Sequence, residues 1–519
     1  MDNRQRTTDN ENSIEYMKLR NILPIAIIAT MLAACGQHLT VPSNVQMESR
    51  LPKIYPDYTE VTIPANICPM NFIVQEGESE AVARLTFPGG EHIYGEGQKI
   101  LIDEEQWKEM LDSAKGQEIK VEVFAKIGDT WKGYQPFNFY VAEDSIDEYI
   151  SYRAIQPSYV AYEKLSINQR NLTNFDVREI YNNMSVSNEE VGQCINCHSY
   201  KNFKTDNMLF HMRQGFGGTM LVTNGQLKKI DLKTEETLSA GVYPAWHPTH
   251  NLIAFSTNKT GQSFHTKDLN KIEVQDTESD LILYDVDKNE VSIISELDDE
   301  LEVFPTWSPD GKKLYFCSAH FEYYNDSIEK SAEMIQRYKE VKYSLYSVDF
   351  NPDTKEFDNV QMVYDAASDS IDQSVTLPRV SPDGRYLLFA QAAFGCFHVW
   401  HADADIYMMD LKTKDVQKLD AVNSDRSESY PTWSSNGRWI MVDSRRDDGN
   451  YTRPYIAYFD KNGKAHKAFL LPQQDPNFYT FYLRSFNRPE FMIEPVKITP
   501  REFAAKAKED AIPAKYAAQ

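Results

Sequence analysis

The chain has 519 residues and a formal net charge of −23, because 77 Asp and Glu outnumber 54 Lys and Arg. With 41% apolar and 25% charged residues it can bury sizeable cores, which excludes a wholly disordered chain and a membrane protein with many spans. A nucleic-acid groove needs clustered Lys and Arg to displace counterions, so the acidic balance argues against nucleic acid as a partner. Six cysteines are too few for a disulfide-held scaffold of this length.

The first 34 residues have the organisation of an export signal. The segment from Met17 to Arg20 carries two positive charges, and residues 22–34 are almost entirely apolar. This run is too short to cross about 30 Å of hydrocarbon as a helix, and it ends in small residues, as secretory signals do. We therefore expect residues 1–34 to be a signal peptide, with Met17 as its more natural start. A buried helix that ends in Cys35 is the alternative.

Residues 32–36, Leu-Ala-Ala-Cys-Gly, resemble the lipobox of bacterial lipoproteins. The resemblance implies that Cys35 becomes the mature N-terminus and carries acyl chains, which anchor the protein without a transmembrane helix. Residues 35–55 then form a lipidated tether. Some bacterial lipoproteins use an acidic run after this cysteine for export to the cell surface, and residues 36–40 contain no acid. We expect a lipid-anchored protein of the bacterial cell envelope, on the outer membrane and facing the periplasm.

Two regions precede the repeats described below. Residues 56–144 predict a small β-rich, sandwich-like domain, because short segments with alternating apolar and polar residues follow one another there. One helix is expected within it at residues 104–113, where two apolar side chains have the i, i+4 spacing of a buried helical face. The composition of residues 145–204 differs, and we expect a connector with a helix near residues 174–183.

After residue 200 the chain repeats one unit four times. The copies span residues 243–255, 304–316, 377–389 and 430–442. Two copies contain Ser-Pro-Asp-Gly, in which proline fixes φ at about −65° and glycine accepts a positive φ, so that the turn joins two strands. Trp246, Trp307 and Trp433 supply bulk that packs between adjacent sheets.

These repeats resemble the TolB-type β-propeller, and the resemblance covers about residues 205–480, more than half of the chain. It implies a fold dominated by β-structure, with four-stranded blades around an axis that leave only short, protected sheet edges. Five blades are recognisable, a sixth can form after Leu471, and residues 481–519 are then a C-terminal tail. An array of β-sandwiches with similar turns is the alternative. Such repeats are specific for a fold and say little about activity.

The connector ends in Gln193-Cys194-Ile195-Asn196-Cys197-His198, which matches the Cys-x-x-Cys-His attachment signature of c-type haem. Two thiols with two residues between them can form thioethers with the two vinyl groups of one porphyrin, and the adjacent imidazole can ligate the iron. The signature predicts one covalent haem c, with Cys194 and Cys197 as attachment sites and His198 as an axial ligand. Export supports this prediction, because c-type haem is attached outside the cytoplasm.

Three other interpretations of these residues stay open. A zinc site would need a fourth protein ligand from a second Cys or His pair, and the sequence has no second Cys-x-x-Cys. A thioredoxin-like redox pair would need a surrounding βαβ pattern, which is not evident. A structural disulfide between Cys194 and Cys197 would leave His198 without a role. Elsewhere, Cys317 and Cys396 occupy similar places in consecutive repeats and could pair in an oxidising compartment.

The sixth iron ligand is expected close to the signature. His211 lies 13 residues beyond His198, and Met208 and Met212 compete with it. A second histidine tends to give a lower reduction potential than methionine, which raises it in cytochromes c. A histidine packed within a blade strand is the alternative role for His211.

Two functions from different classes follow. The first is a redox protein, in which one haem serves electron transfer or sensing and the propeller docks an envelope protein or redox partner. The second is a TolB-like interaction scaffold of the cell envelope without redox activity. No Gly-x-Ser-x-Gly, Gly-Lys-Ser/Thr or His-Glu-x-x-His motif occurs, so no catalytic residue is assigned. Envelope proteins and, through the lipid anchor, a membrane are the expected partners.

Overall fold

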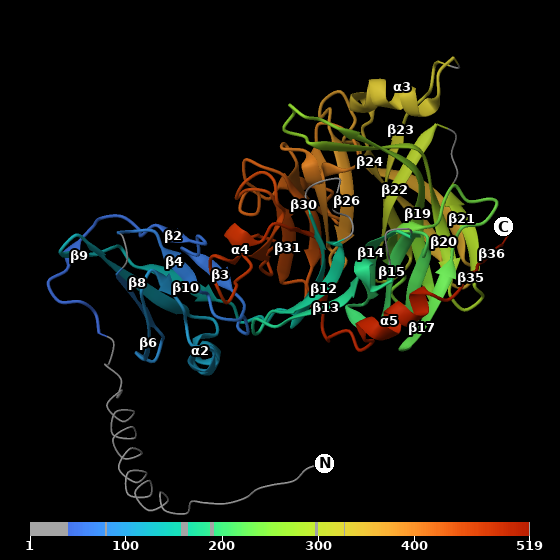
Figure 1. Cartoon of the computed structure of the whole chain (residues 1–519). Helices are drawn as coiled ribbons and strands as arrows, with labels where there is room; N and C mark the ends of the chain where they lie inside the picture. Colours follow the sequence, from blue (N-terminus) through green and yellow to red (C-terminus); the bar gives the residue numbers. More distant parts are fainter. Residues whose placement is uncertain are drawn as a thin grey trace, which may run out of the picture.

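The computed structural model describes residues 40–77, 80–156, 164–186, 191–295, 299–325 and 327–517. The expected signal peptide, its start at Met17 and the lipidation site Cys35 lie outside the described residues. The described chain consists mainly of β-strands and has two parts, a smaller N-terminal unit and a larger ring of sheets (Figure 1). None of the helices in this part of the chain is long and apolar enough to cross a membrane.

The N-terminal unit contains a larger and a smaller sheet. The larger has the order β1-β9-β8-β10-β3, with β5 paired to β8 and β6 to β5, and the smaller has the order β2-β4-β7. The strands are β1 (Gln46–Met47), β2 (Ile54–Tyr55), β3 (Val61–Ile63), β4 (Phe72–Val74), β5 (Ala81–Thr86), β6 (His92–Glu96), β7 (Lys99–Ile100), β8 (Glu118–Ile127), β9 (Thr130–Gly133) and β10 (Phe137–Val141). The expected helix is confirmed as α2 (Glu104–Leu111), where Asp103 caps the N-terminus and Trp107 and Leu111 are buried.

In the described chain, the strands of the ring fall into six four-stranded units. Two of these units are joined into one sheet by a single parallel pair between Ser279 and Leu301. From the inner strand outward, the units are β34 (Ser485–Met492), β11 (Tyr149–Ile155), β12 (Ser166–Asn171) and β13 (Val177–Asn182); β14 (Gln193–Lys201), β15 (Lys204–Gln214), β16 (Gly218–Thr223) and β17 (Gln226–Asp231); β18 (Val242–Trp246), β19 (Leu252–Phe264), β20 (Ile272–Asp285) and β21 (Glu290–Ser295); β22 (Glu300–Trp307), β23 (Lys313–His320), β24 (Ser344–Asn351) and β25 (Glu356–Tyr364); β26 (Ser374–Val380), β27 (Tyr386–Ala392), β28 (Asp405–Asp410) and β29 (Val416–Lys418); and β30 (Glu428–Trp433), β31 (Trp439–Ser444), β32 (Arg453–Tyr458) and β33 (Phe469–Leu470).

Strands that are far apart in the sequence close the ring. The inner strands β34, β14, β18, β22, β26 and β30 contact one another in this order, and β30 contacts β34 in turn. β34 comes from the C-terminal region and pairs antiparallel with β11, which precedes the other units in the chain. Closure of this kind leaves only short edges exposed, and the arrangement is that of a β-propeller.

The ring takes in more of the chain than the repeats indicate. β11 to β14 lie within residues 145–204, where the sequence predicts a connector, and β34 lies within residues 481–519, where it predicts a tail. The prediction of a helix near residues 174–183 is wrong, because that segment forms β13 and pairs with β12. Pairing with an existing sheet outweighs a weak local preference for helix.

The last described segment fastens two neighbouring units along their outer strands. After α5 (Pro500–Ala507), β35 (Ile512–Pro513) pairs in parallel with β17, and β36 (Lys515–Tyr516) pairs in parallel with β21. Figure 1 shows α5, β35 and β36 beside these strands. The C-terminal segment therefore covers two sheet edges that would otherwise expose unpaired backbone groups.

The local geometry of the repeats agrees with the sequence. The Ser-Pro-Asp-Gly turn after β22 is closed by the Gly311 N–H, which donates to the Ser308 carbonyl at 2.9 Å, and Gly311 has a φ of +70°. The expected packing of tryptophan between sheets is also confirmed. Nε1 of Trp307 donates to the carbonyl of Ala245 at 3.1 Å, which ties one unit to the inner strand of the preceding one.

Every inner strand has the same irregularity near its middle. One non-glycine residue bulges there and takes a positive φ, between 47° and 57°. These bulge residues are Cys197, Tyr243, Phe304, Leu377, Tyr430 and Arg488. Proline follows the bulge residue in five strands, whereas His198 follows Cys197 in β14. The Cys-x-x-Cys-His signature therefore lies on an inner strand of the ring, in the place of the proline-containing pair of the repeats.

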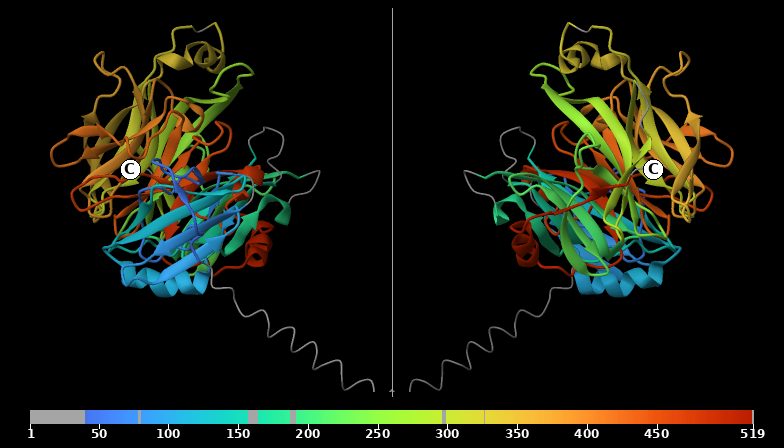
Figure 2. Two further views of the ribbon diagram at one scale, coloured as in Figure 1. Left: turned by 90° about the vertical axis from the view of Figure 1, so that its left-hand side faces the viewer. Right: turned by 90° about the vertical axis from the view of Figure 1, so that its right-hand side faces the viewer.

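The N-terminal unit and the ring share one hydrophobic core. The left-hand view of Figure 2 looks onto the N-terminal unit, with the ring behind it. The ring of Tyr58 packs edge-on against that of Phe469, with 6.3 Å between centroids. Hydrogen bonds reinforce the contact, since the Ser435 N–H donates to Oδ2 of Asp147 at 2.6 Å. The two parts are thus held together by apolar packing and by buried polar contacts.

Candidate functional site

A cavity of about 720 Å³, here called the central cavity, lies between the inner strands of the ring. Its wall includes residues of β11, β14, β15, β18, β19, β30 and β34. Cavities of about 300–1,000 Å³ commonly hold small molecules and cofactors. Four residues that the sequence singles out line it together: Cys197, His198, His211 and Met212.

The imidazole of His198 makes no hydrogen bond of normal geometry. The residue is 1% exposed, and Nδ1 and Nε2 are both buried and without a partner among the described residues. Burial lowers the pKa of His198 well below its usual value, and the guanidinium groups of Arg488 and Arg153 lower it further, while the backbone carbonyls of Arg488 and Ser151 oppose this only in part. The ring is therefore neutral at physiological pH, the form in which histidine ligates a metal ion.

The two cysteines of the signature differ in their relation to the central cavity. Cys197 lines it, whereas Cys194 packs against the apolar cluster beside β15, with its Sγ atom 3.8 Å from Nδ2 of Asn196. Both are partly exposed free thiols. A thiol and an imidazole at a cavity of cofactor size suit a c-type haem, and the second thiol lies just outside the cavity lining. Of the three residues of the signature, Cys197 and His198 are therefore placed to hold a haem in the cavity, and Cys194 is not in its lining.

The fold places two of the three candidates for the sixth iron ligand in the lining of the central cavity and leaves the third outside it. His211 lines the central cavity from β15, opposite Asn196 in the strand ladder, and its Nδ1 atom lies 3.2 Å from Oγ1 of Thr219. Burial lowers the pKa of His211 to about 3, so this imidazole is also neutral. Met212 lines the same cavity, whereas Met208 is buried in an apolar cluster and is not part of the lining.

The bulge residues narrow the space along the axis of the ring, next to the central cavity. The rings of Tyr243 and Phe304 lie with their centroids 4.4 Å apart. Together with Leu377, Tyr430 and Arg488 they surround a space of only about 30 Å³. Such a space is too small for an organic ligand, so the central cavity does not continue past these side chains as a wide channel.

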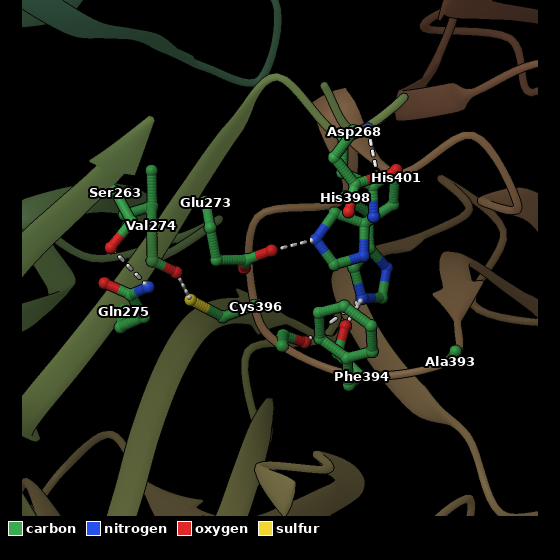
Figure 3. Close-up of polar contacts among 12 residues, drawn as sticks. Ser263, Asp268, Glu273, Val274, Gln275, Ala393, Phe394, Cys396, His398 and His401 are labelled. Carbon is green, nitrogen blue, oxygen red and sulfur yellow. Dashed lines mark hydrogen bonds and ion pairs between the residues drawn. The ribbon is translucent and has the colours of Figure 1, made fainter. Parts of the chain in front are cut away.

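A buried polar cluster fixes one side of the cavity wall (Figure 3). Nε2 of His401 lies 2.8 Å from Oε2 of Glu273, and the two side chains are 0% and 1% exposed. The Cys396 thiol donates to the carbonyl of Val274 at 3.6 Å. Val274 and Phe397 line the central cavity. The cluster therefore braces the β19–β20 hairpin against the loop after β27, two segments from different units of the ring.

A second hollow of about 670 Å³, here called the junction groove, lies where the N-terminal unit meets the ring. The side chains that line it include Gln117, Glu118, Tyr140, Glu143, Asp144, Tyr458, Asp460, Lys461 and Asn462. Four of these are carboxylates and one is a lysine, so the groove is acidic. The hydroxyl of Tyr458 donates to Oδ2 of Asp144 at 2.8 Å, which links the two parts across the groove.

The described residues contain neither the possible disulfide nor a cluster of metal ligands. Cys317 and Cys396, which the sequence allows to pair, are both buried free thiols, and so is Cys68. Among the described residues, no group of three or more His, Cys, Asp or Glu is placed to hold a metal ion.

Sequence reasoning missed two arginines of the central cavity, Arg153 and Arg488. Arg153 lies on β11 in the expected connector, and nothing in its local sequence marks it. A signal for Arg488 does exist. It is followed by Pro489, and the bulge residues Tyr243 and Phe304 are likewise followed by proline.

Comparisons with known proteins give structural similarity only. No family model matches the chain, and no curated protein matches its sequence. TolB from Acinetobacter baumannii is 13% identical, with a TM-score of 0.41 over 72% of this chain and 78% of that one. An oligogalacturonate lyase from Vibrio parahaemolyticus is 14% identical, with a TM-score of 0.31 over 61% of this chain and 93% of that one. A puromycin-hydrolyzing peptidase from Mycobacterium tuberculosis is 11% identical, with a TM-score of 0.35 over 69% of this chain and 52% of that one.

Proposed function

We propose that this protein is an interaction scaffold of the cell envelope, in which the N-terminal unit and a six-bladed propeller together hold a basic segment of a partner protein. The acidic junction groove carries the proposal. Its carboxylates come from both parts, with Glu118 and Glu143 on one side and Asp460 on the other. The shared core holds the two sides in a fixed relation, so the groove is formed before a partner arrives.

The chemistry of the groove indicates what it would recognise. Clustered carboxylates attract Lys and Arg and orient them during encounter. Tyr140 is 39% exposed and, with Tyr458, adds an aromatic surface of the kind that is enriched at protein interfaces. A partner segment that carries several positive charges fits this surface, whereas an acidic segment would be repelled.

A site-specific cross-linking experiment tests the scaffold. A photo-reactive amino acid replaces Asn462 in the groove or, as a control, Val360, which is 49% exposed on β25. In cells, we expect a discrete protein adduct from position 462 and none from position 360. The double variant Glu118→Lys/Glu143→Lys should abolish the adduct, and Glu105→Lys/Glu109→Lys on α2 should not. An adduct that survives the groove reversal, or its absence from the parent protein, contradicts the proposal.

A second function rests on a separate observation: His198, beside Cys197 in the central cavity, is buried and has no hydrogen bond of normal geometry to any described residue. We propose that Cys194 and Cys197 would carry a c-type haem and that His198 and His211 would hold its iron. A bound haem would supply one-electron transfer or ligand sensing. The hydroxyl of Thr219, 3.2 Å from Nδ1 of His211, would orient this second imidazole and leave its Nε2 for the iron.

Attachment is tested with protein made in a host that matures c-type cytochromes. We expect haem that stays on the chain in a denaturing gel, at one iron per chain. Cys197→Ala should lose most of this haem, whereas the matched variant Cys68→Ala should keep it, because Cys68 is buried in the shared core. Iron-free protein from such a host, or covalent haem in the double variant Cys194→Ala/Cys197→Ala, contradicts the assignment and leaves the scaffold proposal standing.

Location in the envelope is a further part of the proposal. We propose that Cys35 carries the lipid that anchors the protein to the outer membrane. Radiolabelled palmitate should be incorporated by the parent chain and not by Cys35→Ser, while Cys68→Ser keeps the label. Labelling that persists in Cys35→Ser contradicts the anchor.

A further inference from the structure

The charge of the central cavity is opposite to that of the chain. The protein has a net charge of −23. The lining of the cavity nevertheless includes Arg153, Arg213, Lys233 and Arg488, and Asp231 is its single carboxylate among the residues that the structure describes. Cations that are gathered in a partly enclosed space raise the local concentration of anions, because the surrounding protein screens charges less well than water does.

Arg153 is held in place by neutral groups. Its NH1 group donates to the side-chain oxygen of Asn196, and its NH2 group donates to Oδ1 of Asn487 at 2.6 Å. Asn196 and Asn487 each precede a bulge residue on the neighbouring inner strands β14 and β34. Two amide oxygens fix the orientation of the guanidinium but cannot neutralise it. Its Nε atom is buried and has no partner among the described residues.

The carboxyl groups near Arg153 are engaged elsewhere. Glu490 forms ion pairs with both Arg379 and Arg488, so one carboxylate serves two guanidinium groups. Asp443 accepts the backbone N–H of Arg488 at 3.0 Å, and burial raises the pKa of its carboxyl group well above the usual value, although Arg445 and Arg153 oppose this. Arg153 forms no ion pair with any described residue. The positive charge of Arg153 is therefore not neutralised by a carboxylate of the described chain.

His198 adds a second, independent indication of a ligand. Both of its ring nitrogens are buried and have no hydrogen-bond partner of normal geometry among the described residues, although the backbone carbonyls of Arg488 and Ser151 lie close, and the residue lines the same cavity as Arg153. Buried polar atoms are nearly always hydrogen-bonded in native proteins, so an unpaired imidazole beside a cavity points to a group that completes it. A neutral imidazole can donate one hydrogen bond to an anion.

We propose that the central cavity binds the carboxylate group of a small organic anion, with the guanidinium of Arg153 as its anchor and His198 as a hydrogen-bond donor. Arginine suits this task because its guanidinium stays charged and its NH2 group keeps a second hydrogen, which can form a charge-assisted hydrogen bond with a carboxylate. The carboxylate has two sources, a propionate arm of a porphyrin or a free organic acid. The proposal goes beyond the scaffold function and does not require covalent attachment of haem. His198 donates to the anion only when it does not ligate iron, and Arg153 is the anchor in either case.

Binding is measured by titration calorimetry on the full chain, purified without haem from a host that does not attach it. The probes are citrate, a free organic acid, and metal-free protoporphyrin IX, which carries two propionates and has no iron to ligate. We expect saturable binding of at least one probe, and we expect Arg153→Gln to weaken it by about tenfold or more, the effect of losing one charge-assisted hydrogen bond. Citrate binding identifies a free acid, and binding of the porphyrin alone identifies a propionate.

Two further variants separate anion binding from folding. Arg178→Gln makes the same change on an exposed part of β13, in the same sheet, and should bind like the parent. Asn487→Asp keeps the hydrogen bond to Arg153 and supplies the missing carboxylate within the chain, so it should weaken binding about tenfold without loss of thermal stability. Failure of both probes to bind the parent protein overturns the proposal. Undiminished binding in folded Asn487→Asp and Arg153→Gln also overturns it.

Discussion

Glu273 and His401 meet in the interior although 128 positions separate them in the chain, with Oε2 of the carboxylate 2.8 Å from Nε2 of the imidazole. The other oxygen of Glu273 and the other nitrogen of His401 have no hydrogen-bond partner among the described residues. The pair links the β19–β20 hairpin to the loop after β27, as Figure 3 shows. Removing one member leaves the other buried and uncompensated.

Truncation of this pair should destabilise the protein strongly. We expect Glu273→Ala to lower the free energy of unfolding by about 3 kcal/mol, because His401 stays buried without its partner. The matched change Glu356→Ala, at an exposed position on β25, should alter it by no more than about 0.5 kcal/mol. Urea denaturation, followed by tryptophan fluorescence, measures both. Equal effects of the two substitutions would show that the pair contributes nothing.

Two turn glycines in consecutive repeats provide a steric comparison. Gly311 and Gly384 have nearly equal φ values, +70° and +72°, so alanine is strained at both. A Cβ atom at Gly311 would lie 2.4 Å from ring atoms of His247, whereas at Gly384 the nearest atom is Cδ of Pro309 at 3.5 Å. Gly384→Ala should cost about 1 kcal/mol and Gly311→Ala about 2 kcal/mol more, since His247 must move. Thermal and urea denaturation give the difference, and equal losses would mean that the His247 ring moves at no cost.

Glu302 should make stability depend on pH. It is 1% exposed, neither carboxyl oxygen has a hydrogen-bond partner of normal geometry in the described part of the chain, and burial raises its pKa to about 7 from the ordinary 4.5. Between these two values the unfolded chain releases the proton and the folded chain retains it, so this group lowers stability as pH rises from about 4.5 to about 7. Glu302→Gln should therefore stabilise the protein at pH ~8, by about 1–3 kcal/mol, and much less at pH ~5. Glu356→Gln serves as the control, and a gain that is the same at both pH values would contradict the prediction.

Cysteine reactivity should follow burial. Cys194 and Cys197 are partly exposed, whereas Cys68, Cys317 and Cys396 are buried, and burial raises the pKa of each of these three thiols. Because the thiolate is the reactive form, haem-free protein should be alkylated first at Cys194 and Cys197. Peptide mass spectrometry after treatment with iodoacetamide, with and without urea, resolves each site. Early modification of Cys396 in the folded protein would indicate that the cluster in Figure 3 opens readily.

Several features follow from the sequence because their causes are local. Proline and glycine set the backbone angles of the turn that ends at Gly311, and the i, i+4 spacing of Trp107 and Leu111 predicts α2. The recurrence of the proline-glycine turn signal along the chain indicates blades around an axis. The signature at Cys194, Cys197 and His198 names a chemistry in the same way, because it depends on residue types at fixed spacing.

Only the tertiary structure decides how the ring closes and what surrounds the signature. β34 pairs with β11, and Arg153 donates to Asn487 across 334 positions, and neither contact has a local sequence pattern. The fold also places Cys197 and His198 in the wall of the central cavity and leaves Cys194 outside its lining. Strand pairing and burial depend on which distant segments meet, and the free energy that selects those contacts comes from the closed ring as a whole rather than from any short stretch of sequence.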